Sequence, residues 1–207
     1  MGKWCLVRHG QTEWNTKVRV QGHSDIALSE AGQGQAQRVA RRLASISFTA
    51  AYSSDLARAT ETAEAILLGR NVSLRAAPEL RELSYGLWEG MSYLEVQAQY
   101  PQLYAQLLTG DLTFAPPGGE SVHDIVRRVD PLISRLKAAH ASDAENILVV
   151  GHGGSLRALL VGALGLPLGA FWRFQLAPAS ISILSLYSEG ATLDLWNDTS
   201  HLASSDE

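Results

Sequence analysis

The sequence predicts an α/β fold, a three-layer αβα sandwich in which helices cover both faces of a mostly parallel sheet. The chain has 207 residues, 46% of them apolar and 18% charged, which suffices for one domain with a large core. Short apolar runs alternate with segments of helical periodicity, an order typical of parallel strands joined by helices. Two strand-like runs near the C-terminus predict a final antiparallel hairpin. We expect residues 1–207 to form a single domain.

The N-terminal part predicts three strands and two helices, in the order Lys3 to Val7 (strand), 29–45 (helix), 49–53 (strand), 55–68 (helix) and 72–76 (strand). Each predicted strand is a short apolar run bounded by polar residues. Ser29 is the predicted N-cap of the first helix, because its hydroxyl can accept a hydrogen bond from the first turn. By the same reasoning, Ser54 or Asp55 is the predicted cap of the second helix.

Residues 84–120 lack this regularity and predict a small helical insertion. Ser92 and Glu95 form a capping-box pattern, and Pro101 is expected to interrupt the helical segment that follows. Beyond the insertion, the sequence predicts a helix from Ser121, a strand at 146–150, a helix at 154–164, and hairpin strands at 180–187 and 191–196 that turn at Glu189-Gly190. Pro131 is expected to kink the helix that begins at Ser121.

Composition excludes several classes of function. Seventeen Lys and Arg residues against 21 Asp and Glu residues give a net charge of −4, which argues against a nucleic-acid partner or an anionic membrane surface. Cys5 is the only cysteine, so an internal disulfide and a Cys-based zinc site are excluded. No apolar stretch reaches the ~18 residues of a membrane span. The sequence therefore predicts a soluble cytoplasmic protein.

Four polar residues follow different predicted strands. His9, Arg58, Glu82 and His152 each come within a few residues of a strand end. Parallel strands bring such positions to one edge of the sheet, where α/β proteins bind ligands and where helix N-termini offer N–H groups to anions. With Arg8, the set predicts an anion pocket that contains its own acid. We expect the insertion at 84–120 to cover this pocket.

Taken singly, each of these residues has an ordinary structural explanation, as an ion-paired arginine or a histidine bonded to backbone. The repetition argues otherwise, because Val7-Arg8-His9-Gly10 and Val150-Gly151-His152-Gly153 both place a histidine between an apolar strand and a glycine. Glycine there allows a tetrahedral group to approach the backbone.

Rival catalytic designs find little support in the sequence. It contains no phosphate-loop motif, no G-x-S-x-G elbow and no H-E-x-x-H zinc helix. His9, His152 and Glu82 could in principle bind a metal, but the neighbouring arginines favour an anionic ligand. We therefore expect no metal and no cofactor.

The segment Leu6-Val7-Arg8-His9-Gly10-Gln11-Thr12-Glu13-Trp14-Asn15 resembles the signature of the histidine phosphatase (phosphoglycerate mutase-like) superfamily. Further matching motifs are Tyr52 to Ala63, Leu80 to Glu82, Gly86 to Gly90, Pro117 to Ser121 and Gly151 to Gly154. The resemblance covers almost the whole chain and implies a phosphoglycerate mutase-like fold. An aspartate follows the second histidine in the acid-phosphatase branch, whereas Gly153 follows it here, so that branch does not fit.

The resemblance implies a role for each matched residue. His9 resembles the phosphorylated nucleophile and Glu82 the general acid. The phosphate clamp is implied for Arg8, Arg58 and His152, and substrate contacts are implied for Asn15, Gln21, Gly22 and Gly153. In the implied mechanism a nitrogen of His9 attacks the phosphoryl group while Glu82 protonates the leaving oxygen. Glu82 then activates water, which hydrolyses the phosphohistidine.

The insertion favours a phosphatase over a mutase. Between Glu89 and Gly119 there is no Lys, Arg or His, whereas mutases of this family are expected to neutralise their substrate's carboxylate with basic residues in that region. Lys17 and Arg19 remain candidate contacts for a second anion. The Pro117-to-Ser121 motif and the segment 171–174 are similar to those of α-ribazole phosphatases and broad-specificity phosphatases.

We therefore predict a phosphatase that acts on a small phosphorylated metabolite through a phosphohistidine. An α-ribazole 5′-phosphate phosphatase of cobalamin biosynthesis is the first alternative. A cofactor-dependent phosphoglycerate mutase and a non-catalytic phosphate-binding module rank lower, since an intact His9 and Glu82 argue against the module. The sequence leaves a homodimer open.

Overall fold

A six-stranded sheet forms the centre of the computed structural model, which describes residues 2–140, 145–187 and 190–203. The strands are β1 (Gly2–Arg8), β2 (Ala50–Ser53), β3 (Leu74–Ala76), β4 (Asn146–Gly151), β5 (Ile181–Tyr187) and β6 (Gly190–Asp198). Their order in the sheet is β3-β2-β4-β1-β5-β6. The pairs β3–β2, β2–β4 and β4–β1 are parallel, and β5 is antiparallel to both β1 and β6. The prediction of a mostly parallel sheet with a terminal antiparallel hairpin is confirmed.

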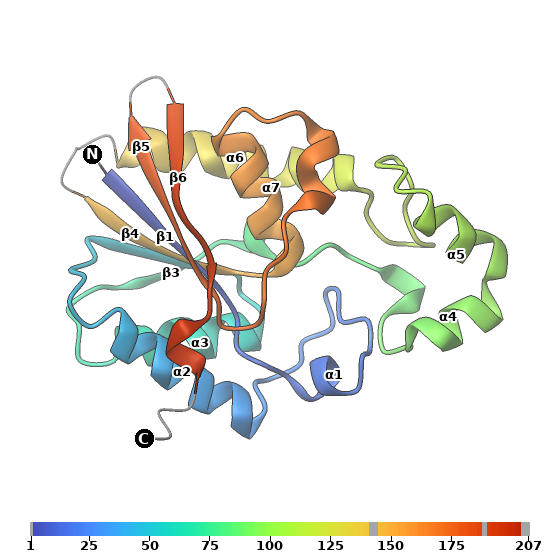
Figure 1. The fold of residues 1–207 in the computed structure, drawn as a ribbon, viewed down its shortest axis with the longest axis horizontal. Helices are drawn as coiled ribbons and strands as arrows, with labels where there is room; N and C mark the ends of the chain where they lie inside the picture. Colours follow the sequence, from blue (N-terminus) through green and yellow to red (C-terminus); the bar gives the residue numbers. More distant parts are fainter. Residues whose placement is uncertain (1, 141–144, 188–189, 204–207) are drawn as a thin grey trace.

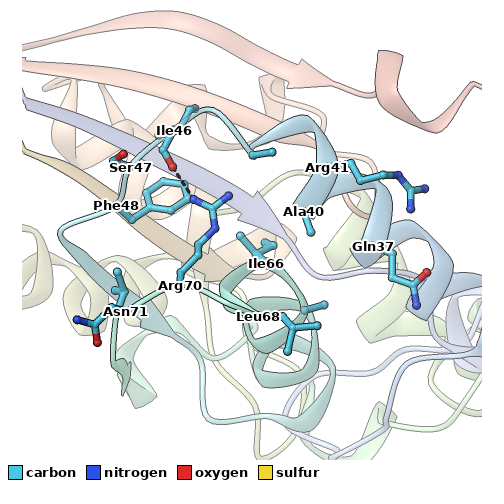
Figure 2. Close-up of a pocket in the computed structure, with 13 residues that line it drawn as sticks. Gln37, Ala40, Arg41, Ile46, Ser47, Phe48, Ile66, Leu68, Arg70 and Asn71 are labelled. Carbon is cyan, nitrogen blue, oxygen red and sulfur yellow. Dashed lines mark hydrogen bonds between the residues drawn. The ribbon is translucent and has the colours of Figure 1, made fainter.

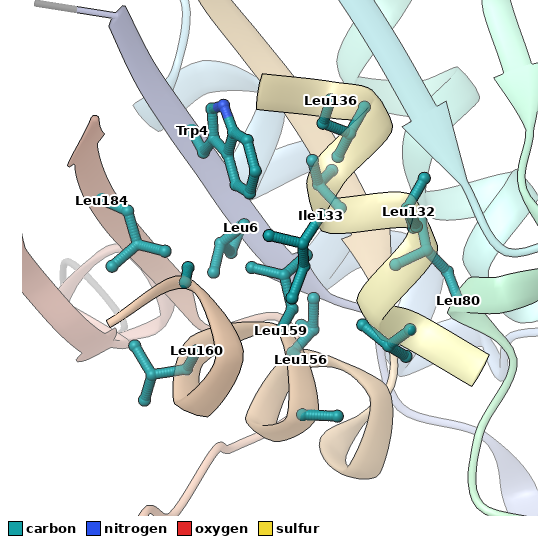
Figure 3. Packing of buried hydrophobic residues seen from close by; sticks show 14 of the residues in the cluster. Trp4, Leu6, Leu80, Leu132, Ile133, Leu136, Leu156, Leu159, Leu160 and Leu184 are labelled. Atoms are coloured by element: carbon teal, nitrogen blue, oxygen red, sulfur yellow. The ribbon is translucent and has the colours of Figure 1, made fainter. Parts of the chain in front are cut away.

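Helices lie on both faces of the sheet (Figure 1). The helices are α1 (Glu13–Thr16), α2 (Glu30–Arg42), α3 (Ala57–Leu67), α4 (Tyr93–Gln99), α5 (Pro101–Leu108), α6 (Val122–Ala139) and α7 (Gly153–Ala163). Because strand side chains alternate between faces, Trp4 and Leu6 of β1 enter the core beneath α6 and α7, as Figure 3 shows. Cys5 and Val7 enter the core shared with α2 and α3. Burial of these two cores is the main force that fixes the sheet between its helices.

Three details of the helices agree with the predictions. The Ser29 hydroxyl caps α2, and Ser92 with Glu95 forms the capping box of α4. Pro101 interrupts the insertion as expected, since α4 ends before it and α5 begins at it. Helix α6 is continuous through Pro131. Glu189 of the predicted hairpin turn lies outside the described residues.

The predicted cap of α3 is wrong. Leu56 is the N-cap residue, and its side chain has no atom that could accept a hydrogen bond; the Ala57 N–H donates to Asp25 Oδ1 at 2.7 Å. Asp55 instead accepts from Arg81 Nε at 2.7 Å. A charge-assisted pair with a guanidinium is stronger than a single bond to a backbone N–H, so the carboxylate turns away from the helix.

Helices α4 and α5 extend away from the sheet on the side toward which β1 and β4 run (Figure 1). A small core of their own, centred on Val20, Trp88 and Val96, supports them. The 84–120 segment therefore stands beside the carboxyl edge of the sheet. None of the helices among the described residues has the length and apolar content needed to cross a membrane.

Candidate active site

The structure brings the predicted site residues together at the carboxyl edge. The ring centroids of His9 and His152 are 4.9 Å apart, and Arg58 Nε donates to His152 Nδ1 at 3.2 Å. A Cβ added to Gly153 would lie 3.6 Å from Glu82 Oε2 and 3.8 Å from Arg8 Cζ. Gly153 thus leaves open the space between the acid and the arginine.

The backbone of His9 is fixed from two sides. Its N–H donates to the carbonyl of Gly151 at 3.0 Å, and its own carbonyl accepts from the Ala179 N–H at 3.0 Å. Its ring Nδ1 lies 2.7 Å from the carbonyl of Gly10. A carbonyl only accepts, so Nδ1 carries the proton and Nε2 presents a lone pair. Burial, together with the positive charges of Arg58 and Arg8, lowers the pKa of His9 well below its ordinary value.

His152 adopts the opposite tautomer. Arg58 Nε can only donate, so His152 Nδ1 accepts and its Nε2 carries the proton. That Nε2 is buried and has no hydrogen-bond partner within the described ranges. Burial and the charge of Arg58 lower the pKa of His152 as well. The pair therefore combines a nucleophilic nitrogen on His9 with a neutral donor on His152.

Backbone carbonyls anchor Arg58 and Arg8, and neither is paired with an acid of the described residues. Arg58 is fully buried and donates to the carbonyls of Gly22 and Ser24, each at 2.8 Å. Arg8 Nη1 donates to the carbonyl of Leu176, and its buried Nε has no partner in the described part of the chain. Burial lowers the pKa of Arg8, and that of Arg58 to about 10, but a guanidinium is still protonated at neutral pH. This corner of the site is suited to an anion.

Glu82 uses its two carboxyl oxygens differently. Oε1 accepts from the backbone N–H of Gly154 at 2.7 Å and from that of Leu83 at 2.8 Å. Oε2 faces the open space beside Gly153. When the group is protonated, Oε1 is the accepting carbonyl oxygen and Oε2 carries the proton. The geometry aims the only proton of Glu82 at the pocket.

Three of the predicted substrate contacts, Asn15, Gln21 and Gly22, bond to other groups of the protein. Asn15 Oδ1 accepts from the N–H and the hydroxyl of Thr12, each at 3.0 Å. The Thr12 hydroxyl also lies 3.0 Å from Gln21 Oε1. Gly22 has a φ of +54°, and an added Cβ would come within 2.0 Å of Glu89. These residues shape the loop beside Arg58, and their predicted contact with substrate stays a prediction.

Arg128 and Glu120, which were not among the predicted site residues, position the loop that carries Glu82. Arg128 donates to the carbonyls of Glu79, Arg81 and Glu82, and pairs with both carboxylate oxygens of Glu120. His23 Nε2 also lies 2.8 Å from the Glu82 carbonyl. Glu120 belongs to the matched Pro117-to-Ser121 motif, and that motif was the only feature of the sequence that pointed to it. Nothing in the sequence indicated Arg128.

A groove on the surface lies apart from the candidate active site. A groove of about 870 Å³ between α2 and α3, drawn in Figure 2, is lined by Phe48, Leu68 and Arg70 and contains none of the predicted site residues. Within the ranges that the structure describes, no three His, Cys, Asp or Glu side chains are grouped as metal ligands. The absence of a metal requirement stays a prediction.

The two buried histidines predict how stability depends on pH. An unfolded chain protonates each imidazole as the pH falls below 6.5, whereas burial keeps both neutral in the folded chain. The free energy of unfolding is therefore expected to fall below that pH, by up to about 1.4 kcal/mol per pH unit for each histidine. Urea unfolding between about pH 7.5 and 5.5 measures the slope. His9→Asn and His152→Asn should each reduce it, and an unchanged slope in both variants contradicts the assignment.

Known proteins resemble the chain along its length. The model of the Histidine phosphatase superfamily (branch 1) matches residues 4–199. An adenosylcobalamin/alpha-ribazole phosphatase of Salmonella typhimurium is 35% identical over 192 residues, 93% of this chain and 94% of that protein. Phosphoserine phosphatase 1 of Hydrogenobacter thermophilus is 32% identical over 202 residues, 98% and 95% of the two chains. The crystal structure of the alpha-ribazole phosphatase from Shigella flexneri superposes with a TM-score of 0.88 at 29% identity, covering 95% and 96%.

The fold and the gathered histidines, arginines and acid define a phosphate-handling α/β enzyme. The chain belongs to the histidine phosphatase superfamily, and it is a phosphatase.

Proposed function

We propose that the protein hydrolyses small phosphomonoesters through a phosphohistidine formed on His9. The observation that carries the proposal is that His9 and His152, which lie side by side, are neutral tautomers protonated on different nitrogens. His9 directs an unprotonated Nε2 and His152 a protonated Nε2 into the same buried corner. One nitrogen can bond to phosphorus while the other binds a phosphoryl oxygen.

In the first step, His9 Nε2 attacks phosphorus and the bond from phosphorus to the ester oxygen breaks. Glu82 Oε2 donates its proton to that oxygen, so the alcohol leaves neutral. The developing charge on the phosphoryl oxygens is met by His152 Nε2–H and Arg8 Nε–H, which have no partner among the described residues, and by the positive charge of Arg58 beside His152. Arg8 and His152 donate from fixed positions, which lowers the cost of reorganisation during the reaction.

In the second step, Glu82 acts as a base. Its Oε2, now without a proton, accepts one from a water molecule in the space vacated by the alcohol. The resulting hydroxide bonds to phosphorus, the bond from phosphorus to Nε2 breaks, and the lone pair returns to His9. Glu82 is again protonated, and inorganic phosphate leaves. Because the His9 Nδ1–H group donates to the carbonyl of Gly10, Nε2 is the nitrogen that stays available for each turnover.

The similarity to an alpha-ribazole phosphatase makes α-ribazole 5′-phosphate the second candidate substrate. The segment from Leu168 to Arg173, next to the site, places Trp172 at the surface, where a base could stack on it. The cytoplasmic location stays a prediction, and a homodimer stays open.

Phosphatase activity is expected to exceed mutase activity by a wide margin. The segment from Glu89 to Gly119 offers no cation. The assay compares kcat/KM for phosphoserine, α-ribazole 5′-phosphate, sugar phosphates and p-nitrophenyl phosphate, with EDTA present throughout. Exchange between 2- and 3-phosphoglycerate is followed in parallel. Exchange faster than phosphate release, or activity that EDTA abolishes and zinc restores, would contradict the proposal.

A further inference from the structure

Glu89 lies at the start of the insertion and takes no part in the reaction steps above. Its Oε1 accepts from the N–H groups of His23 at 2.9 Å and Tyr85 at 3.1 Å. Its Oε2 accepts from the N–H and the hydroxyl of Ser24, each at 2.7 Å. An ionised carboxylate only accepts hydrogen bonds, which suits a place where all of these neighbours donate. The side chain therefore joins the loop at 22–24 to the first turn of the insertion.

The peptide group between Gly22 and His23 connects Glu89 to the phosphate clamp. Its N–H donates to Glu89 Oε1, and its carbonyl accepts from Arg58 Nη2 at 2.8 Å. In a trans peptide the N–H and the carbonyl point in opposite directions, so one planar unit lies between the carboxylate and the guanidinium. Hydrogen bonds in series polarise one another. The negative charge of Glu89 thus strengthens the bond that holds Arg58.

Ser24 provides a second connection between the same two charges. Its N–H and hydroxyl donate to Glu89 Oε2, and its carbonyl accepts from Arg58 Nη1 at 2.8 Å. Both carbonyls that anchor Arg58 therefore lie in a loop whose N–H groups bind Glu89. Burial lowers the pKa of Arg58, and the charge of Glu89 is among those that oppose this decrease. Removing the carboxylate would release the loop that carries both anchors.

Backbone pairing brings Glu89 to the loop. The Gly90 N–H donates to the Val20 carbonyl at 2.8 Å, and the Val20 N–H donates to the Met91 carbonyl at 2.9 Å. The segment that leads into the loop therefore lies beside the segment that follows Glu89. Gly22 adopts a positive φ, and a Cβ there would occupy the space of the Glu89 carboxylate. The glycine allows the loop to fold around the acid.

We propose that Glu89 is a positioning residue for the phosphate clamp, which holds the guanidinium of Arg58 in place through the loop at 22–24. This inference rests on the proposed phosphomonoesterase. Arg58 acts on the phosphoryl group, which all substrates share, and not on the alcohol that leaves. Loss of Glu89 therefore weakens every phosphate ligand by a similar factor, whereas loss of Glu82 acts according to the leaving group.

The test is Glu89→Gln, which keeps the size of the side chain but places an NH₂ group, a donor, against donors of the loop. The dissociation constant of inorganic phosphate, measured by calorimetry, is expected to rise roughly 10- to 100-fold. The value of kcat/KM should fall by a similar factor for glycerol 3-phosphate and for p-nitrophenyl phosphate. Glu61→Gln is the matched control and should match the wild type. Glu61 accepts from the Leu28 N–H at 3.0 Å, a bond that an amide oxygen can keep.

A double-mutant cycle with Arg58→Ala shows whether Glu89 acts through the arginine. In the Arg58→Ala background, Glu89→Gln should change kcat/KM for p-nitrophenyl phosphate by less than about threefold, because the group that it positions is absent. Urea unfolding checks that each variant is folded. Arg58→Lys replaces Arg58→Ala if the latter does not fold, since a single ammonium group cannot keep the geometry of two anchored guanidinium nitrogens.

Three outcomes overturn the positioning role and leave the phosphatase intact. These are an unchanged phosphate affinity in Glu89→Gln, a loss of equal size in both backgrounds, and a loss confined to alkyl phosphates, which would mean that Glu89 acts on Glu82. Wild type whose phosphate binding depends on Glu89 but which hydrolyses no monoester would instead overturn the proposed function.

Discussion

Replacing His9 with Ala is expected to abolish turnover and phosphoenzyme formation together. His9 Nε2 is the atom that bonds to phosphorus in the proposed first step, and Nε2 of the neighbouring His152 carries a proton and cannot replace it. The fold should persist, because the backbone bonds of His9 to Gly151 and Ala179 do not involve its side chain. Loss of kcat by at least about 10⁴-fold is the expected magnitude for removal of a nucleophile.

The measurement is rapid quenching with labelled substrate, followed by tests of the label's stability. The wild type should yield an acid-labile, base-stable phosphoprotein, and His9→Ala none. His123→Ala, which removes an exposed histidine on α6, serves as control and should retain both label and turnover. Label recovered on serine, or full labelling of His9→Ala, would show that another residue is the nucleophile.

Glu82→Gln is expected to reduce activity in a way that depends on the leaving group. An amide can accept the two backbone N–H bonds that Oε1 now receives, but it cannot supply the proton of Oε2. With alkyl phosphates, kcat/KM should fall by roughly 10²- to 10⁴-fold, because the alkoxide needs a proton to depart. With p-nitrophenyl phosphate the loss should be much smaller, since the phenolate leaves unaided.

Stopped-flow assays with p-nitrophenyl phosphate separate the two steps of the reaction. If Glu82 is also the base for water, the variant should release a burst of nitrophenolate and then turn over slowly. Glu64→Gln, at an exposed position of α3, is the matched control. Equal losses on both substrate types without a burst would mean that Glu82 positions other groups and does not transfer the proton.

The sequence predicted the sheet and the location of the site because both depend on local patterns. Apolar runs and helical periodicity mark the core-facing residues, and parallel strands necessarily end at one edge. The sequence alone therefore predicts that His9 and His152 lie near each other. The prediction for the N-cap of α3 was wrong because the first turn of the helix bonds to a distant residue. The Ala57 N–H donates to Asp25, which lies 32 residues earlier in the chain.

Side-chain contacts between segments far apart in the chain could not be predicted from the sequence. Arg128 contacts a loop that lies 46 to 49 residues earlier in the chain, and no short motif encodes that distance.

The separate small core of the insertion has a consequence for how this enzyme could diversify. Val20, Trp88 and Val96 pack with residues of α4 and α5 that belong to neither of the two main cores, and Tyr85 joins this small core to the one beneath α6 and α7. Substitutions in α4 or α5 can thus accumulate without moving the reacting groups. We therefore expect that replacing α4 and α5 with those of a relative changes substrate selectivity and leaves the chemical steps unchanged.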